Sequence, residues 1–194
     1  MRCLICRQPE KMVNKMDKKY VTLSKFLSLV LRHKPETIGL KLDKDGWTSV
    51  DDLLAACQKK QAITKDELRF VVANNDKKRF EFNSDETRIR ASQGHSVPVD
   101  LGYKAQRPPA KLYHGTAEQF IDAILEKGIE KRRRHDVHLS TSLETASNVG
   151  KRHGKLVQLE INSGAMYADG HEFRLSTNGV WLTEFVPVKY IKRI

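Results

Sequence analysis

Residues 24–35, SKFLSLVLRHKP, constrain the fold most, because they predict a helix with one buried face and a defined C-terminal end. Apolar residues at helical spacing require one face of this helix to be buried; they are Leu23, Phe26, Leu27, Val30 and Leu31. Pro35 cannot continue the helix, so we expect it to end near His33. Arg32, opposite the apolar face, and His33 are then held at that end. Taken alone, the segment is more typical of a core helix with a solvated arginine and a histidine favoured by the helix dipole.

The charge balance indicates a polyanionic partner. The 194 residues include 35 lysines and arginines against 24 aspartates and glutamates, a net charge of +11, and both halves share the excess. Nucleic acid is the commonest partner of so basic a protein. The length allows one large domain or two small lobes, each with its own core.

The cysteines and the absence of targeting segments indicate a reducing compartment. Cys3, Cys6 and Cys57 cannot build a disulfide framework, and nothing resembles a signal peptide or a membrane span, so we expect a cytoplasmic protein with no membrane partner. Cys3 and Cys6 have the spacing of a zinc knuckle, but no second ligand pair follows, so we expect no metal. Residues 1–17 are predicted to be a basic leader.

Residues 18–96 are predicted to form a winged-helix-like lobe. Residues 38–50 alternate apolar and polar around an Asp45-Gly46 turn, which favours a β turn between extended segments. Ser49 can cap a helix over 50–60, and the capping box TKDE opens another over 65–74. Segments 79–82 and 88–91 flank an NSDE turn and form the wing.

A second lobe is predicted over residues 111–194, after a linker at 97–110 that contains three prolines. Short strands are expected at LYHGT, VHLS, KLVQLEI and GVWLTEFVPVKYI, with helices at AEQFIDAILEKG, which Gly128 ends, and at ETASNVG. Mostly antiparallel strands with helices on one side give an α+β fold class.

Two basic clusters mark the predicted lobes. Residues 76–80, DKKRF, place Lys77, Lys78 and Arg79 at the start of the wing, and residues 131–135, KRRRH, repeat the pattern later. Each cluster fits a solvated face on composition alone. As a functional feature, arginine supplies a planar fork for phosphate and lysine a mobile charge. Two clusters in two lobes predict a charged cleft between them.

A nucleotide site is predicted at two strand ends. His114, Gly115 and Thr116 end one strand, and His138 and Ser140 lie on another. Glycine lets a ligand approach the backbone, and the neighbouring polar groups can bind ribose hydroxyls or an amide. Neither GxGxxG nor GxxxxGK[ST] occurs, which excludes Rossmann and P-loop sites. Either histidine alone would fit a hydrogen-bonded core residue.

Seven motifs in one order, SKFLSLVLRHKP, DKKRF, QGHS, LYHGT, RHDVHLS, GKRHG and NGVWLT, resemble the RNA 2′-phosphotransferase family, KptA. The resemblance covers residues 22–188. It implies a winged-helix N-terminal lobe and a C-terminal lobe with the ADP-ribosyltransferase fold. It also implies a monomer that removes an internal RNA 2′-phosphate, such as that left by tRNA splicing, and consumes NAD⁺ as a co-substrate.

The resemblance also implies roles for residues. The family's Arg-His-Arg-Arg tetrad falls on Arg32, His33, Arg79 and Arg134, with Lys77 and Lys78 beside it for RNA phosphates. Its NAD⁺ triad falls on His114, His138 and Val180, alongside Gly115, Thr116 and Ser140. Protein-modifying relatives carry glutamate where Val180 stands, so Val180 agrees with an anionic phosphate acceptor.

A rival hypothesis from another class is a non-catalytic nucleic-acid-binding protein whose second lobe senses a nucleotide. Binding needs positive charge but no histidine held at a helix end, so the tetrad favours the enzyme.

Overall fold

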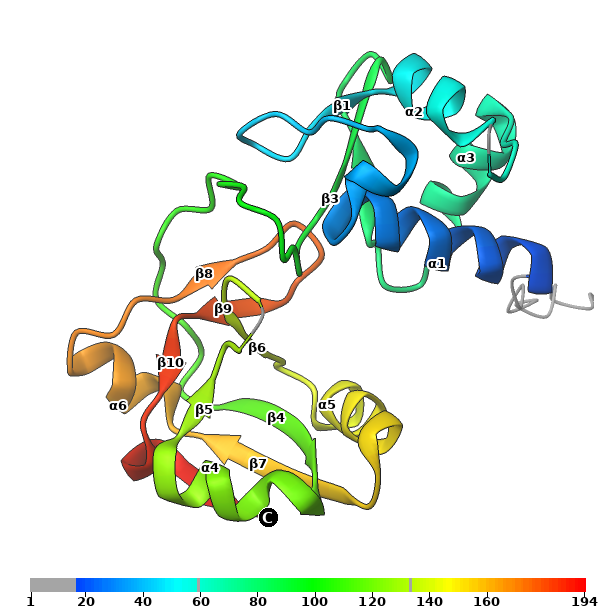
Figure 1. The fold of residues 1–194 in the computed structure, drawn as a ribbon. Helices are drawn as coiled ribbons and strands as arrows, with labels where there is room; N and C mark the ends of the chain where they lie inside the picture. The colour runs from blue at the N-terminus through cyan, green and yellow to red at the C-terminus, as the bar shows by residue number, and fades with distance from the viewer. Residues whose placement is uncertain (1–16, 59, 133) are drawn as a thin grey trace, which may run out of the picture.

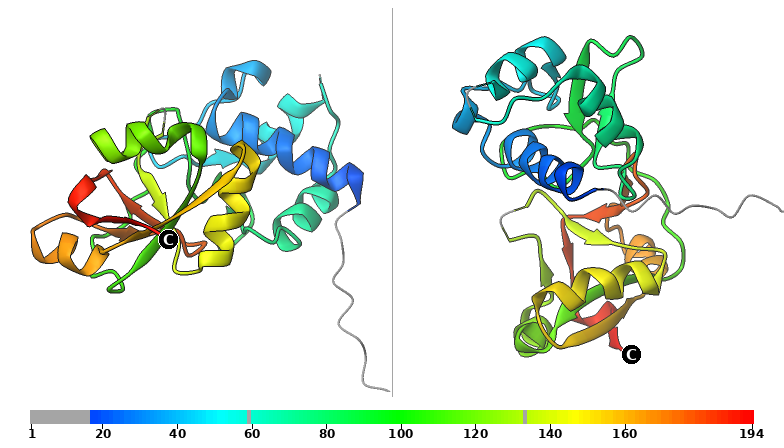
Figure 2. Two further views of the ribbon diagram at one scale, coloured as in Figure 1. Left: turned by 90° about the horizontal axis from the view of Figure 1, so that it is seen from below. Right: turned by 90° about the vertical axis from the view of Figure 1, so that its right-hand side faces the viewer.

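The computed structural model describes residues 17–58, 60–132 and 134–194 (Figure 1). Its buried apolar side chains form two clusters, one drawn from residues 23–91 and the other from residues 112–190. Figures 1 and 2 show the two corresponding parts side by side, joined by the segment that contains residues 97–110. Apart from Asp17, the predicted leader, which includes Cys3 and Cys6, lies outside the described residues.

The first helix ends where its sequence predicts. Helix α1 spans Lys18–Arg32, and His33 follows as its cap, with its backbone N–H bound to the Leu29 carbonyl at 3.0 Å. The side chains on its buried stripe are at most 2% exposed; they are Leu23, Leu27, Val30 and Leu31. A short 3₁₀ turn, η1 (Pro35–Ile38), follows. Burial of this stripe fixes the direction in which Arg32 leaves the helix.

Both predicted capped helices are confirmed. Helix α2 spans Val50–Cys57, and the Ser49 hydroxyl accepts from the Asp52 N–H at 3.3 Å. Helix α3 spans Lys65–Ala73 behind a capping box of Thr64 and Glu67. Helix α2 ends at Cys57, before the predicted end at residue 60, and the N–H groups of Lys60 and Gln61 both bind the Cys57 carbonyl, at 3.0 and 2.8 Å.

A three-stranded antiparallel sheet completes the first part, in the order β1 (Thr48–Ser49), β3 (Arg88–Ala91), β2 (Phe80–Phe82). The predicted wing, β2 and β3, is confirmed as a hairpin. The turn before Trp47 is also present, but the two sides of the turn do not pair as strands: η1 ends at Ile38, residues 39–47 belong to no strand, and β1 begins at Thr48. The Asp43 carboxylate accepts from the Asp45 and Trp47 N–H groups, and β1 pairs with β3 instead.

The second part contains helices and small antiparallel sheets, consistent with an α+β class. One sheet has the order β11 (Ile191–Arg193), β7 (Leu156–Ile161), β4 (Leu112–Ala117), and another the order β6 (Val137–Leu139), β9 (Trp181–Thr183), β8 (Arg174–Leu175). Strands β5 (Ile129–Glu130) and β10 (Phe185–Val186) form a third. A bridge between Tyr113 and Ser140 places the end of β6 beside β4.

Helices and turns connect these strands. They are η2 (Glu118–Phe120), α4 (Ile121–Lys127), α5 (Leu143–Gly150), η3 (Lys151–His153), α6 (Ser163–Ala168) and η4 (Val188–Tyr190). Gly128 ends α4 with φ of 89°, as predicted, whereas α6 was not predicted. Among the described residues, no helix is long and apolar enough to cross a membrane.

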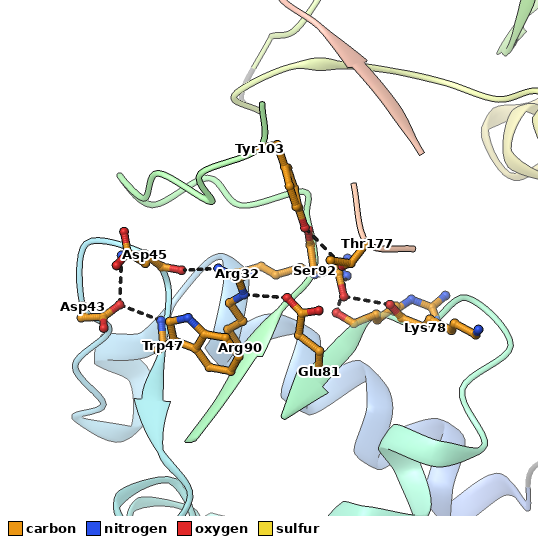
Figure 3. Close-up of polar contacts among 11 residues, drawn as sticks. Arg32, Asp43, Asp45, Trp47, Lys78, Glu81, Arg90, Ser92, Tyr103 and Thr177 are labelled. Carbon is orange, nitrogen blue, oxygen red and sulfur yellow. Dashed lines mark hydrogen bonds and ion pairs between the residues drawn. The ribbon is translucent and has the colours of Figure 1, made fainter. Parts of the chain in front are cut away.

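The segment predicted as a linker lies against both parts. The Asp100 N–H binds the Lys44 carbonyl at 2.7 Å, and the Gln106 N–H binds the Phe173 carbonyl at 2.8 Å. Between them, the Tyr103 hydroxyl donates to the Ser92 carbonyl and lies 3.2 Å from the Thr177 hydroxyl, which Figure 3 shows. These bonds bring the two parts together around the end of α1.

Candidate active site

Two arginines from the first part meet at the end of α1. Arg32 donates from Nη2 to the Arg79 carbonyl at 3.2 Å, and Arg79 donates from Nη1 to the Asn75 side-chain oxygen at 3.0 Å. Burial, followed by the charges of Arg79 and Arg134, lowers the pKa of Arg32 to about 10. Among the described residues, no carboxylate forms an ion pair with Arg32, Arg79 or Arg134. The cluster therefore carries positive charge that an anion could neutralise.

His33 lies at the edge of this cluster. Its Nδ1 is 3.0 Å from the Ser96 hydroxyl, and the Ser96 N–H binds the Arg32 carbonyl at 2.8 Å. Burial, together with the charges of Arg32 and Arg134, lowers the pKa of His33. A neutral imidazole held beside cationic groups can accept a proton and later return it.

Arg134 reaches the same place from the second part. Its Nη1 lies 3.2 Å from Nδ1 of His138, so the guanidinium donates and Nδ1 accepts. A side chain built on Gly94 would lie 3.5 Å from the His138 ring and 3.6 Å from Nη1 of Arg32. The structure thus brings Arg32, His33, Arg79 and Arg134 together, although Arg134 lies beyond the segment that connects the two parts.

The two histidines of the predicted nucleotide site are neighbours. Nδ1 of His114 lies 3.1 Å from the His138 carbonyl, so Nδ1 carries the proton and Nε2 is left as an acceptor. Burial, followed by the charges of Arg134, Arg32 and His114, lowers the pKa of His138 to about 3. Burial is also the main cause of the lowered pKa of His114. Both rings are therefore neutral near pH 7.

Gly115 meets a different requirement from the one the sequence suggested. A Cβ built on Gly115 would stand 1.9 Å from the backbone carbonyl of Ala146 in α5. The absence of a side chain thus lets β4 and α5 pack closely. The space that a side chain of residue 115 would occupy is taken by the backbone of α5. The next residue, Thr116, is also buried, at 6% exposed.

Ser140 and Val180 lie at the same end of the β6–β9 pair. The Ser140 hydroxyl accepts from the Ser142 N–H at 3.0 Å, at the start of α5. The Val180 N–H and carbonyl both bind Ser176, so the residue is fixed by its backbone while its side chain is half-buried. Residue 180 therefore contributes no carboxylate to the site.

The loop before β2 is held from both sides. The Lys77 carbonyl accepts from Nδ2 of Asn178 at 2.9 Å. The Lys78 carbonyl accepts from the Ser92 hydroxyl at 2.9 Å, a bond that Figure 3 shows. Lys78 is exposed, whereas burial and the charges of Arg152 and Arg79 lower the pKa of Lys77. This loop therefore presents lysines beside the arginine cluster.

Several residues of the site had no role assigned from the sequence. Asn75 is 3% exposed and binds both Ser24 and Arg79, and Arg152 lies close enough to lower the pKa of Arg79. His95 is buried near Arg32. The motifs GKRHG and QGHS contained Arg152 and His95, but nothing in the sequence indicated a partner for Asn75. In the part of the chain that the structure describes, no group of three or more side chains could hold a metal ion.

These features define a two-part α+β protein with a cluster of arginines at the junction, none of them in an ion pair with a carboxylate among the described residues, flanked by neutral histidines. The family model "RNA 2′-phosphotransferase, Tpt1 / KptA family" matches residues 18–185, and the chain belongs to this family. Its members transfer the 2′-phosphate of RNA, so the protein is a transferase by family.

Curated relatives from distant bacteria are similar over nearly their whole lengths. A probable RNA 2′-phosphotransferase of Flavobacterium johnsoniae is 53% identical over 172 residues, covering 88% of this chain and 94% of the relative. One of Nostoc punctiforme is 49% identical over 179 residues, covering 92% and 99%. One of Burkholderia pseudomallei is 54% identical over 170 residues, covering 87% and 92%.

Proposed function

We propose that this protein removes an internal 2′-phosphate from RNA by transferring it to NAD⁺. The observation that carries the proposal is the convergence of Arg32, Arg79 and Arg134, without a carboxylate partner, beside His33 and His138. Such a cluster suits a phosphate dianion, which accepts several charge-assisted hydrogen bonds at once. The names of the curated relatives support RNA as the substrate.

The two parts divide the substrates between them. The first is a winged-helix-like lobe in which Lys77 and Lys78 bind RNA phosphates next to Arg79. The second is an ADP-ribosyltransferase-like lobe that binds NAD⁺ through His114, His138 and Val180, with Thr116 and Ser140 nearby. The acceptor Nε2 of His114 suits a ribose hydroxyl, which supports this assignment.

In the first step, an oxygen of the RNA 2′-phosphate attacks the anomeric carbon of the nicotinamide ribose. A C–O bond forms, the C–N bond breaks, and neutral nicotinamide leaves with the bonding electrons. The phosphate is already an anion, so this step needs no general base. The arginines hold the nucleophile, and the apolar Val180 places no negative charge near it. The product is RNA-2′-phospho-ADP-ribose.

In the second step, the ribose 2″-hydroxyl attacks the phosphorus and the RNA 2′-oxygen leaves. One proton must leave the 2″-hydroxyl and one must reach the RNA 2′-oxygen. His33 accepts the first proton and donates the second. Charge accumulates on the phosphate oxygens, where Arg32, Arg79 and Arg134 stabilise it. The products are 2′-hydroxyl RNA and ADP-ribose 1″,2″-cyclic phosphate.

We further propose that the protein acts as a cytoplasmic monomer, without a metal, on tRNA-like RNA bearing a splice-junction 2′-phosphate. The deciding experiment is to mix it with NAD⁺ and an oligonucleotide carrying one internal 2′-phosphate and to measure nicotinamide release. The same oligonucleotide without the phosphate is the control. Phosphate-dependent nicotinamide release is expected. RNA binding with no release in either case would instead favour a non-catalytic RNA-binding protein.

A further inference from the structure

A buried asparagine, Asn75, holds the guanidinium of Arg79, and no step of the proposed reaction uses it. Asn75 follows helix α3 and is only 3% exposed. Its side-chain oxygen accepts from Nη1 of Arg79 at 3.0 Å and from the Lys77 N–H at 3.2 Å. Its side-chain nitrogen donates to the hydroxyl of Ser24 in α1 at 2.8 Å. Because Arg79 and the Lys77 N–H can only donate, the oxygen of the amide must face them.

The backbone of Arg79 is fixed as well as its side chain. Its carbonyl accepts from Nη2 of Arg32 at 3.2 Å and from the Ser92 N–H at 2.9 Å. The Asn75 carbonyl closes the preceding turn by accepting from the Lys78 N–H at 2.8 Å. Since both its carbonyl and its guanidinium are hydrogen-bonded, Arg79 loses little freedom when it binds an anion. Groups held in this way stabilise charge at the least cost of reorganisation.

The contacts of residue 75 would also admit a carboxylate. The Arg79 guanidinium and the Lys77 N–H are donors, and the Ser24 hydroxyl can accept or donate. An aspartate at this position would therefore satisfy all three partners, and its hydrogen bond to Arg79 would be charge-assisted and stronger. It would also form an ion pair with Arg79 and neutralise the charge that attracts a phosphate. The amide provides the same hydrogen bonds without this neutralisation.

The charges around Arg79 favour the binding of an anion. Burial, followed by the charge of Arg152, lowers the pKa of Arg79, so the cation is destabilised until an anion binds beside it. Asp76 acts in the opposite direction, but its side chain is exposed, and it forms no ion pair with Arg79 in the described part of the chain. The side chain that contacts the guanidinium, that of Asn75, carries no charge.

We propose that Asn75 is a positioning residue whose neutral amide orients Arg79 toward the 2′-phosphate without neutralising it. The inference rests on the proposed function for the identity of the anion. It assigns two properties to residue 75. Its hydrogen bonds set the direction of the guanidinium, and its lack of charge preserves the affinity of Arg79 for phosphate. An aspartate at this position should keep the first property and lose the second.

The test compares Asn75→Asp, Asn75→Ala and the control Asn162→Asp. Asn162 is exposed and caps α6 with its side-chain oxygen, a role that aspartate fills equally well, so the control makes the same change in net charge. Each protein is titrated without NAD⁺, once with an oligonucleotide that carries one internal 2′-phosphate and once with the same oligonucleotide lacking it. The dissociation constant without the phosphate, divided by that with it, measures the phosphate contact and is called the phosphate preference.

The aspartate and alanine variants should differ in opposite directions in binding and in stability. Asn75→Asp should lower the phosphate preference about tenfold or more, because it neutralises Arg79. It should also reduce the slope of log Kd against log salt by about 0.7, the value for one phosphate contact on a single strand. Asn75→Ala should keep this slope and more of the preference. In thermal unfolding, however, Asn75→Asp should be at least as stable as Asn75→Ala, because the carboxylate keeps the partners of the amide satisfied.

A residue that only supported the fold would lose phosphate preference and stability in the same order. The proposal is therefore overturned if Asn75→Asp is less stable than Asn75→Ala, or if its phosphate preference and salt slope equal those of Asn162→Asp. These measurements need no catalysis, so they are independent of the proposed reaction. If the unmodified protein prefers the phosphorylated oligonucleotide but releases no nicotinamide, the proposed function fails and the role of Asn75 stands.

Discussion

The side-chain amide of Asn178 donates to the backbone carbonyl of Lys77, 101 residues earlier, at 2.9 Å. Asn178 lies between β8 and β9 in the second lobe, and Lys77 lies in the loop before β2 in the first. Ser176 fixes the other end of the amide by donating to its oxygen at 2.8 Å. A single side chain thus holds the loop that carries Arg79 against the opposite lobe.

Replacing Asn178 by alanine should free this loop without unfolding either lobe. The lost hydrogen bond is worth about 1 kcal/mol, so thermal stability should change little. Amide hydrogen exchange over residues 76–79 should become faster, and kcat/KM for RNA should fall several-fold. Asn148→Ala, at an exposed asparagine of α5, is the matched control. Unchanged exchange in this loop would show that the contact does not position it.

Arginine and histidine variants should separate chemistry from NAD⁺ binding. Arg32→Ala and Arg79→Ala each remove a charge-assisted contact to the phosphate, worth about 2–4 kcal/mol in the transition state, and should leave NAD⁺ affinity nearly unchanged. His114→Ala should instead weaken NAD⁺ binding. Single-turnover rates and NAD⁺ titrations measure the two effects, with Arg69→Ala, an exposed arginine paired with Glu86, as the control. Equal losses of NAD⁺ affinity in all three variants would contradict these roles.

Val180 offers a test of the phosphate acceptor. Val180→Glu should slow nicotinamide release strongly, because a carboxylate here repels the incoming 2′-phosphate. Val180→Gln has nearly the same shape without the charge and should retain more activity. The ratio of the two rates, measured at saturating NAD⁺, should shrink as salt screens the repulsion. Equal rates for the two variants would exclude an electrostatic role for this position.

Local signals predicted the elements of the first lobe well. The stop at Pro35, the cap at Ser49 and the capping box at Thr64 each act within a few residues, so the sequence suffices to place them. The alternation over residues 38–50 placed the turn but not the pairing of β1 with β3, because alternation of apolar residues does not reveal which strand takes the hydrogen bonds. Helix α6 was missed since it has only six residues.

The site was less predictable than the elements, because its contacts join residues far apart in the sequence. Arg32, Arg79 and Arg134 could be named from motifs, but their closeness depends on how the lobes meet. The same limit hid Asn75, whose partners Ser24 and Arg79 belong to separate elements. For Gly115, the sequence indicated a need for space but could not show that α5 fills it.

The buried neutral histidines should make stability depend on pH. The pKa values of His95 and His138 are about 3 in the folded protein, against about 6.5 in an unfolded chain. The unfolded state therefore binds more protons below pH 6.5, and the free energy of unfolding falls as the pH falls, by about 1.4 kcal/mol per pH unit for each histidine. Denaturant unfolding between pH 5 and 6.5 measures this slope. His95→Phe should reduce it by about one proton; an unchanged slope would mean that His95 is not buried in its neutral form.

His33 should act mainly in the second chemical step. Phosphate attack on NAD⁺ needs no proton transfer, whereas transesterification must move one from the 2″-hydroxyl to the RNA oxygen. His33→Ala should therefore release nicotinamide but accumulate RNA-2′-phospho-ADP-ribose, visible as a retarded band on a gel. Arg79→Ala and Arg134→Ala should share this behaviour in part, since charge builds on the phosphate as the ring closes.

The pH dependence gives an independent check on the same residue. Burial, Arg32 and Arg134 lower the pKa of His33, so its neutral form, which can accept the proton, persists below the usual range of histidine. Decay of the intermediate in the unmodified protein should rise with pH up to a midpoint below about 6.5 and then level off, and His33→Ala should lose this limb. If His33→Ala instead blocks nicotinamide release and no retarded band forms, His33 positions the incoming phosphate and does not transfer the proton.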